Sequence, residues 1–238
     1  MTDEPYRWLE AIANRREYIR DQLKGASPVF AFSRPEGILL CGVGVGQSKV
    51  FEVYDRHALV TLGHPVDIEK VRQTLIEAAH LEGFTRAPED VTLRRLLSAS
   101  LGPLLKNAFE QIFAAPLLIE LILAEVGRTP DQDVLVRVGY DGTPRFIKNS
   151  IVVAHTNATD EQAAVDWLSA QVQPNAALKD VGRLALRAEG ALMSGKPFAS
   201  PPTEPNPIAK ERVIEMAILE RIEPNRVHYR SLDASTIS

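Results

Sequence analysis

The chain has 238 residues, of which 45% are hydrophobic and 24% charged, so it can bury a sizeable core in one large domain or two small ones. Its 27 basic and 31 acidic residues give a net charge of -4, which offers no electrostatic basis for binding nucleic acid or an anionic membrane. The amino-terminal segment has no apolar core of the signal-peptide type, and no stretch approaches the about 18 apolar residues of a membrane helix. Cys41 is the only cysteine, so no internal disulfide can form and we expect a reducing, cytoplasmic location.

The first expected element is an amphipathic helix that begins near Pro5 and ends at Leu23, with Gly25 as a suitable stop. Its apolar stripe consists of Leu9, Ile12, Ile19 and Leu23. The expected charged remainder consists of Arg15, Arg16, Glu17, Arg20 and Asp21. Because this helix precedes everything else, its stripe must dock on the body of the protein or on a neighbouring chain.

Strand-like and helical patterns then alternate in groups. Four short strands are expected at 29–32, 38–42, 50–54 and 58–62. Two helical segments follow at 66–81 and 90–113, and Gly102-Pro103 should kink or shift the second of them. A second group of strands is expected at 117–126, 134–140 and 151–154, with Asp141-Gly142 as a hairpin signal.

The remainder of the chain contains two more helices, at 160–172 and 176–193, and two closing strands, at 213–219 and 227–231. Between them, the proline-dense segment 197–207 predicts an extended loop. Each group of strands needs both faces covered, and pairs of helices separate the groups. The expected fold is therefore two sheets packed face to face, with helices outside.

Other chemical signals are weak. The glycine-rich run from Gly42 to Lys49 superficially resembles a phosphate loop, but it lacks the final Gly-Lys-Ser/Thr order and leads into a strand, so its glycines indicate a strand end. The five histidines show no spacing typical of metal ligands, so no metal or other cofactor is expected. Cys41 lies in an apolar run and is expected to be buried.

Several stretches resemble a known family. The segment Lys49 to Arg56, which contains Tyr54-Asp55-Arg56, is similar to the lysine and Tyr-Asp-Arg segment of actinobacterial proteasome α subunits. The likeness continues through 117–127, 134–143, 214–220 and 226–232, so it spans nearly the whole chain. The sequence thus resembles the α-type subunits of bacterial 20S proteasomes, which belong to the N-terminal-nucleophile hydrolase superfamily.

The resemblance implies an α+β fold, a four-layer αββα sandwich of the proteasome-subunit type with an N-terminal extension helix. It divides the chain into a gate tail and extension helix (1–26) and an αββα domain (27–238). It also implies a non-catalytic subunit in a homo-oligomeric, heptameric ring. That ring would seat on proteasome β subunits, dock a ring-shaped ATPase activator and admit unfolded protein substrates.

The resemblance places five residues, Met1, Thr2, Asp3, Glu4 and Pro5, near the ring axis as a gate. The archaeal and eukaryotic amino-terminal signature is missing. Their Gly-Gly-Arg-Pro segment is replaced here by 114–117, which reads Ala-Ala-Pro-Leu. Gate details of those α subunits are therefore not carried over to this chain.

Ser27 decides between a structural subunit and an enzyme. A catalytic member of the superfamily uses the side-chain oxygen of its first mature residue as nucleophile and that residue's free α-amine as base. Counting back from Gly37 puts the matching position at or near Ser27, but 26 residues precede it, they predict an ordered helix, and Pro28 follows directly. The alternative is a serine N-terminal-nucleophile hydrolase processed before Ser27. A homomeric ring without a β partner is a third possibility.

Lys49 is the candidate binding residue. The resemblance implies that it lines a pocket between neighbouring subunits and pairs with the C-terminal carboxylate of the activating ATPase, a role suited to an ammonium group. The alternative is a solvated lysine at the start of a strand. No residue is assigned as catalytic.

Overall fold

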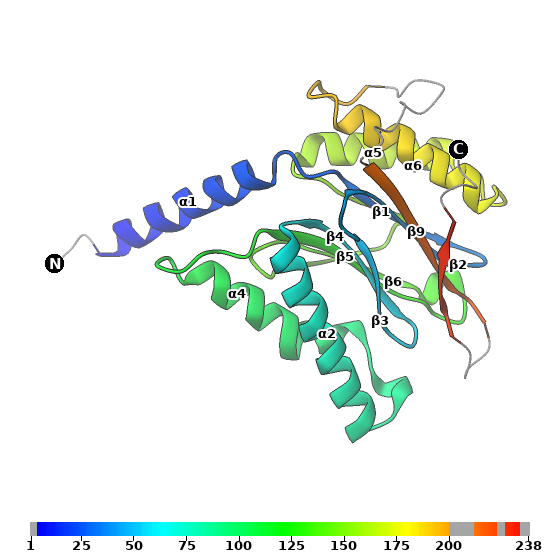
Figure 1. Cartoon of the computed structure of the whole chain (residues 1–238), viewed down its shortest axis with the longest axis horizontal. Coiled ribbons are helices and arrows are strands. Elements are labelled where there is room, and N and C mark those ends of the chain that lie inside the picture. Colours follow the sequence, from blue (N-terminus) through cyan, green and yellow to red (C-terminus); the bar gives the residue numbers. More distant parts are fainter. Residues whose placement is uncertain (1–3, 200–211, 223–226, 234–238) are drawn as a thin grey trace.

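The computed structural model describes residues 4–199, 212–222 and 227–233. Within these ranges the chain forms two five-stranded antiparallel sheets that pack face to face, and helices cover the outer face of each sheet (Figure 1). The expected four-layer αββα fold is confirmed. No helix within the described ranges is both long and apolar enough to cross a membrane.

The first sheet has the strand order β10-β9-β2-β1-β8. Its strands are β1 (Val29–Arg34), β2 (Gly37–Val45), β8 (Ile151–Ala154), β9 (Arg212–Glu220) and β10 (Tyr229–Leu232). The second sheet has the order β3-β4-β5-β6-β7. Its strands are β3 (Val50–Tyr54), β4 (His57–Gly63), β5 (Ile119–Glu125), β6 (Val134–Val138) and β7 (Pro144–Ile147). Strands β3 and β7 are the two edges of this second sheet.

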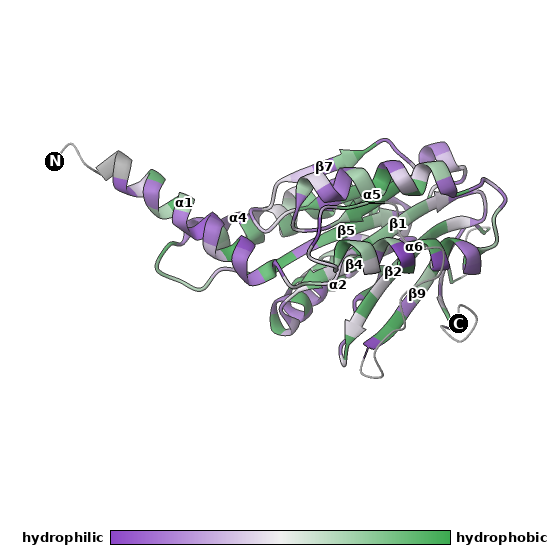
Figure 2. Cartoon of the chain, turned by 90° about the horizontal axis from the view of Figure 1, so that it is seen from above, coloured by the Kyte–Doolittle hydropathy of each residue, from purple (hydrophilic) through white to green (hydrophobic). Residues whose placement is uncertain are grey.

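The helices are α1 (Glu4–Leu23), α2 (Pro65–Thr85), α3 (Leu93–Leu96), α4 (Gly102–Glu110), α5 (Ala158–Gln171) and α6 (Leu178–Leu192). Three apolar layers hold them and the sheets together. One layer lies between the sheets, a second joins the sheet of β5 to α2, α3 and α4, and a third joins the sheet of β1 to α5 and α6. In Figure 2 the strands of the two sheets are mostly green, the colour of hydrophobic residues, and purple hydrophilic residues are frequent on the helices.

Helix α1 extends away from the body, and only its C-terminal end enters the sandwich (Figure 1). Ile19 and Leu23 are buried in the layer between the sheets, whereas Leu9, expected on the same stripe, is 65% exposed. Arg15, expected in the charged remainder, is instead buried. Its Nη2 donates to the carbonyl oxygens of Ala108 (2.7 Å) and Ala114 (2.9 Å) and so joins α1 to α4 and to the segment that follows it.

The expected long helix over 90–113 is interrupted. A 3₁₀ turn (Pro88–Asp90), the short α3, a π-helical stretch (Leu97–Leu101) and α4 replace it. Pro103 has no N–H to donate, and a side chain at Gly102 would meet the Leu97 carbonyl oxygen at 2.8 Å. The predicted shift at Gly102-Pro103 is therefore confirmed, but it takes the form of a π-bulge.

The sequence prediction missed one strand. The hairpin signal Asp141-Gly142 is confirmed, since Gly142 has φ +78° and its N–H donates to the Gly139 carbonyl at 2.9 Å. The partner strand that this turn produces is β7, which has four mostly exposed residues and so lacks the apolar alternation that marks a strand. Most of the proline-dense loop predicted at 197–207 lies outside the described residues.

The packing of α1 predicts that its buried residues contribute to the stability of the folded chain and its exposed residues do not. Ile19→Ala should lower the free energy of unfolding by about 2–5 kcal/mol, because it removes a fully buried side chain from the layer between the sheets. Leu9→Ala on the same helix is the matched control and should change it by less than about 0.5 kcal/mol. Urea unfolding followed by circular dichroism measures both, and equal losses would contradict the docking of α1 seen here.

Candidate functional site

Lys49 lies at the end of the loop that joins β2 to β3, and the glycine-rich run makes room for it. A Cβ on Gly42 would lie 3.3 Å from the Lys49 Cβ, and a Cβ on Gly44 would lie 2.3 Å from the Gln47 carbonyl oxygen. Glycine at these positions lets the loop fold back and the lysine stem lie along β2. The run that superficially resembles a phosphate loop thus has a packing role.

The Lys49 ammonium is directed toward the junction between α1 and β1. Its Nζ donates to the Ser27 carbonyl oxygen at 2.9 Å. The backbone N–H groups of Lys49 and Val50 donate to Glu215 Oε2 of β9, at 2.8 and 3.1 Å. The Lys49 carbonyl oxygen accepts from the Thr61 N–H at 2.9 Å. Both ends of this residue are therefore fixed, and the side chain has a defined direction.

Ser27 belongs to the same polar cluster. Its Oγ donates to Glu189 Oε1 of α6 at 2.9 Å, and Arg212 of β9 forms an ion pair with the same carboxylate. Glu189 is 3% exposed, so this pairing is what allows a carboxylate at that depth. Ser27 itself follows Ala26, whose N–H donates to the Leu23 carbonyl oxygen at the end of α1 (2.8 Å). In the intact chain the Ser27 nitrogen is an amide and cannot act as a base.

Burial lowers the pKa of Lys49 to about 8, and the charge of Arg212 adds to this effect. The carboxylates Glu189 and Glu215 act in the opposite direction without cancelling it. A buried ammonium that is only partly compensated gains from a further anionic partner. The arrangement is therefore chemically suited to receive a carboxylate.

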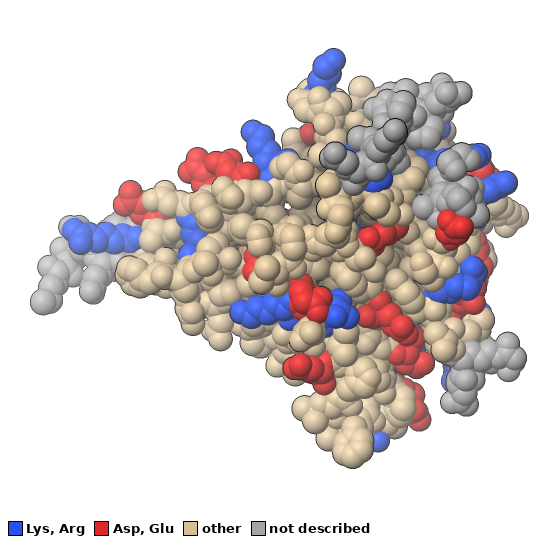
Figure 3. All heavy atoms as spheres, viewed as in Figure 1, with Lys and Arg blue, Asp and Glu red and all other residues tan. Residues whose placement is uncertain are grey.

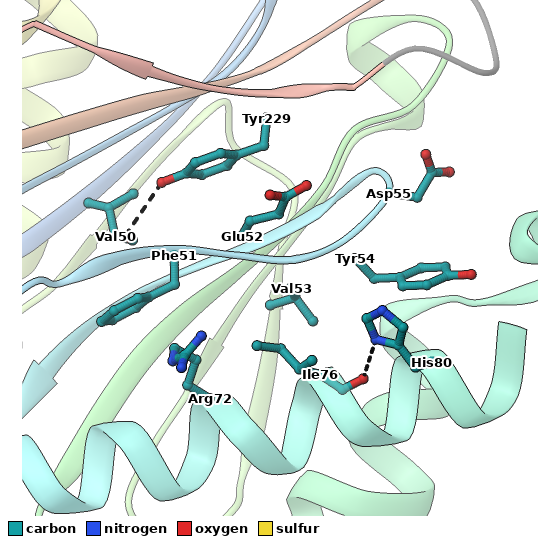
Figure 4. Close-up of a pocket in the computed structure, with 10 residues that line it drawn as sticks. All are labelled: Val50, Phe51, Glu52, Val53, Tyr54, Asp55, Arg72, Ile76, His80 and Tyr229. Carbon is teal, nitrogen blue, oxygen red and sulfur yellow. Dashed lines mark hydrogen bonds between the residues drawn. The ribbon is translucent and has the colours of Figure 1, made fainter.

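An open hollow of about 610 Å³ lies beside this cluster, between β3, β10 and α2 (Figure 4). Lys49 does not line it, but the hollow begins at the next residue, Val50. Arg72 of α2 lies over the Phe51 ring, 5.6 Å from its centroid, and the Tyr54 and His80 rings meet edge to face at 5.1 Å. The wall of the hollow is therefore aromatic and polar at once.

Two titratable groups in this hollow are perturbed. Burial, with smaller contributions from Glu215 and Glu52, raises the pKa of Tyr229 to about 12, and its hydroxyl donates to the Val50 carbonyl oxygen at 3.4 Å. Burial, followed by the charge of Asp55, raises the pKa of Glu52. Tyr229 therefore stays a neutral donor at neutral pH, and the hollow has an acidic rim.

The structure brings Ser27 and Lys49 together, as two of the residues singled out from sequence. Of the expected gate residues, Glu4 and Pro5 are the first residues of α1, and Met1, Thr2 and Asp3 lie outside the described residues. Sequence reasoning missed three members of the cluster: Glu189, Arg212 and Glu215. They come from α6 and β9, far along the chain, and no local spacing links them to Lys49.

Cys41 is buried in β2, and burial raises the pKa of its thiol, which makes it a poor nucleophile. Within the described part of the chain, no three His, Cys, Asp or Glu side chains are grouped so that they could hold a metal ion. The chemistry of the site therefore comes from its lysine, carboxylates and hydroxyl groups.

Comparison with known proteins gives this site its context. No protein-family model matches the chain. The protein named proteasome subunit alpha in Actinosynnema mirum is 28% identical over 223 residues, which cover 93% of this chain and 81% of that relative. The protein of the same name in Pseudarthrobacter chlorophenolicus is 30% identical over 222 residues, which cover 89% of this chain and 85% of that relative. The chain belongs to the proteasome alpha-subunit family.

Membership in the alpha-subunit family confirms the resemblance found in the sequence, and it agrees with the two-sheet sandwich and its preceding helix. The matched regions extend over most of the relatives' own lengths, so the likeness concerns the whole fold and not one motif. The Lys49 cluster is therefore to be understood as part of an alpha-type subunit.

The depressed pKa of Lys49 predicts a pH-dependent stability. In the unfolded chain the lysine keeps its proton up to about pH 10.4, whereas the folded chain loses it near pH 8. Between these values the unfolded state binds more protons, so this lysine makes stability rise with pH there, by on the order of 3 kcal/mol.

Unfolding titrations of the parent chain and of Lys49→Met between pH 7 and pH 10.5 measure this effect. The difference in unfolding free energy between the two should shift in favour of the parent chain as pH rises. Lys70→Met removes an exposed ammonium and serves as the control. A constant difference between the parent chain and Lys49→Met would show that the Lys49 ammonium is not buried as described.

Proposed function

We propose that this chain is a non-catalytic subunit of a 20S proteasome core particle in the cytoplasm. It forms a homo-oligomeric, heptameric ring, seats on a ring of proteolytic β subunits and controls the entry of unfolded proteins. Residues 1–26 act as gate tail and extension helix, with Met1 to Pro5 at the ring axis, and residues 27–238 form the ring body. Family membership supports the core assignment, and the architecture around Ser27 supports the non-catalytic role.

The observation that carries the proposal is the continuity of α1 with β1. Ile19 and Leu23 are embedded between the sheets, so removing the helix would open the core and expose apolar surface. A maturation cut before Ser27 would have to overcome that loss. The free amine that an N-terminal nucleophile needs is then never formed.

Mass measurement tests the proposal directly. The intact purified protein should keep all residues before Ser27, and native mass spectrometry should show a heptameric ring. A mature chain that begins at Ser27 and reacts there with an electrophilic inhibitor would instead establish the serine hydrolase. Co-expression with a β-type subunit of the same organism should yield a joint particle. A stable ring that never takes up a β-type subunit would point to a homomeric scaffold.

We further propose that Lys49 binds the terminal carboxylate of a ring-shaped ATPase activator. Its ammonium is only partly compensated, and the adjoining hollow offers aromatic and polar surface for the residues before the carboxylate. Since the pKa of Lys49 is about 8, the positive charge and with it the affinity should decline as pH rises through that value.

Peptide binding to the assembled ring tests this role by fluorescence anisotropy. Lys49→Ala should weaken binding of the activator's C-terminal peptide by about tenfold or more, the range expected for a charge-assisted pair. The same peptide with an amidated C-terminus should bind weakly to both proteins, and Lys70→Ala is the matched control. Equal affinity of the parent ring and Lys49→Ala for the free-acid peptide would remove Lys49 from the site.

A further inference from the structure

A second hollow, of about 230 Å³, lies where the C-terminal half of α1 meets β7 and the start of α5. Its basic lining residues are Arg16, Arg20, Arg137 and Arg145, and its acidic ones are Glu120 and Asp141. Arg16 and Arg20 stand one turn apart on α1, and Arg145 comes from the edge strand β7. The hollow is thus built from segments far apart in sequence, and it lies beside one edge of the second sheet.

Not all of these charges are compensated within the chain. The charge of Arg137 is compensated, because its guanidinium pairs with Glu120 (2.6 Å) and Glu161 (2.8 Å); it also donates to the His155 carbonyl oxygen (3.0 Å). Within the described residues, Arg16, Arg20 and Arg145 form no ion pair.

Weaker interactions involve two of these arginines: Arg16 lies over the Phe109 ring, and the charge of Arg145 lowers the pKa of Glu161, which burial nevertheless raises to about 7. Asp141 accepts from the Thr143 N–H of its own turn at 3.0 Å. The exposed part of the hollow therefore carries an excess of positive charge.

The opposite edge of the same sheet carries the opposite charge. Glu52 of β3 and Asp55 of the β3–β4 turn are both exposed and form no ion pair within the described residues. They repel each other, since the charge of Asp55 raises the pKa of Glu52. The nearby Arg72 is already held by Glu69, at 2.7 Å. In Figure 3, acidic and basic side chains lie side by side over α2 on the face turned to the viewer, and further acidic side chains lie next to them.

These two surfaces lie at opposite edges of one sheet, because β3 and β7 are its two outer strands. A closed ring of identical chains needs contacts between two different faces of each copy. We propose that a second copy of this chain places its Glu52 and Asp55 against the arginines Arg16, Arg20 and Arg145 of the first. This inference rests on the proposed ring and names the contact that sets its direction.

The charge pattern also disfavours competing assemblies. A two-fold dimer through either face would bring like charges together, arginine against arginine or carboxylate against carboxylate, and like charges at close range repel. Head-to-tail contact removes both repulsions at once. The excess charges therefore favour the head-to-tail contact, which builds a ring, and disfavour the two-fold contact, which would give a dimer.

Charge reversal in the full-length chain tests the proposal. The first variant carries Arg16→Glu, Arg20→Glu and Arg145→Glu, the second carries Glu52→Arg and Asp55→Arg, and a third combines all five. Lys179→Glu with Lys196→Glu, at exposed positions away from both surfaces, is the control. Thermal unfolding checks that each chain is folded, and native mass spectrometry with analytical ultracentrifugation measures assembly.

The first and second variants should each need at least about tenfold more protein to assemble than the parent chain, and added salt should weaken assembly of the parent. The variant that combines all five substitutions should assemble again, because its two surfaces are once more of opposite charge. If the parent chain forms rings and every variant forms them at the same protein concentration, this contact is wrong, but the proposed function is unaffected. A parent chain that stays monomeric would overturn both.

Discussion

The end of α1 packs between the two sheets, and the arrangement of the rest of the molecule depends on that contact. Ile19 and Leu23 share one apolar layer with side chains from both sheets, so the helix is part of the core and not an appendage. The linker from Lys24 to Ser27 is therefore short and fixed. A fixed linker keeps the Ser27 amide inside the chain and aims its carbonyl oxygen at Lys49.

This geometry is unsuited to N-terminal nucleophilic catalysis at Ser27 and leaves a polar cluster around Lys49. The same fold position can present a hydroxyl with a free amine, but here the hydroxyl donates to Glu189 and the nitrogen is an amide. Lys49 is partly desolvated, and burial lowers its pKa although the carboxylates Glu189 and Glu215 act in the opposite direction. The Lys49 charge is only partly compensated, and this is the basis for our proposal that it binds the terminal carboxylate of another protein.

The distribution of ionic groups differs between the interior of the sandwich and the edges of the second sheet. Inside the sandwich, ionic groups are satisfied in compact networks such as Arg137 with Glu120 and Glu161. At the two edges of the second sheet the ionic groups are not all paired. One edge has an excess of negative charge and the other an excess of positive charge. This separation of charge does not stabilise a single subunit. In the proposed head-to-tail arrangement, the positive edge of one copy would pair with the negative edge of the next.

The amino-acid sequence by itself determined most of the order of helices and strands and the two-sheet architecture, and it singled out Ser27 and Lys49 as candidate site residues. It did so because β3 and β8 are short apolar runs flanked by turn residues, so their bounds follow from local pattern alone. Only the tertiary structure decided that Arg15 is buried, that β7 is a strand, and that the partners of Lys49 come from α6 and β9. Local periodicity reports which face of an element is apolar, but the partner of a polar side chain is set by how distant elements pack. That information is carried by the three-dimensional contacts and by no segment of the chain alone.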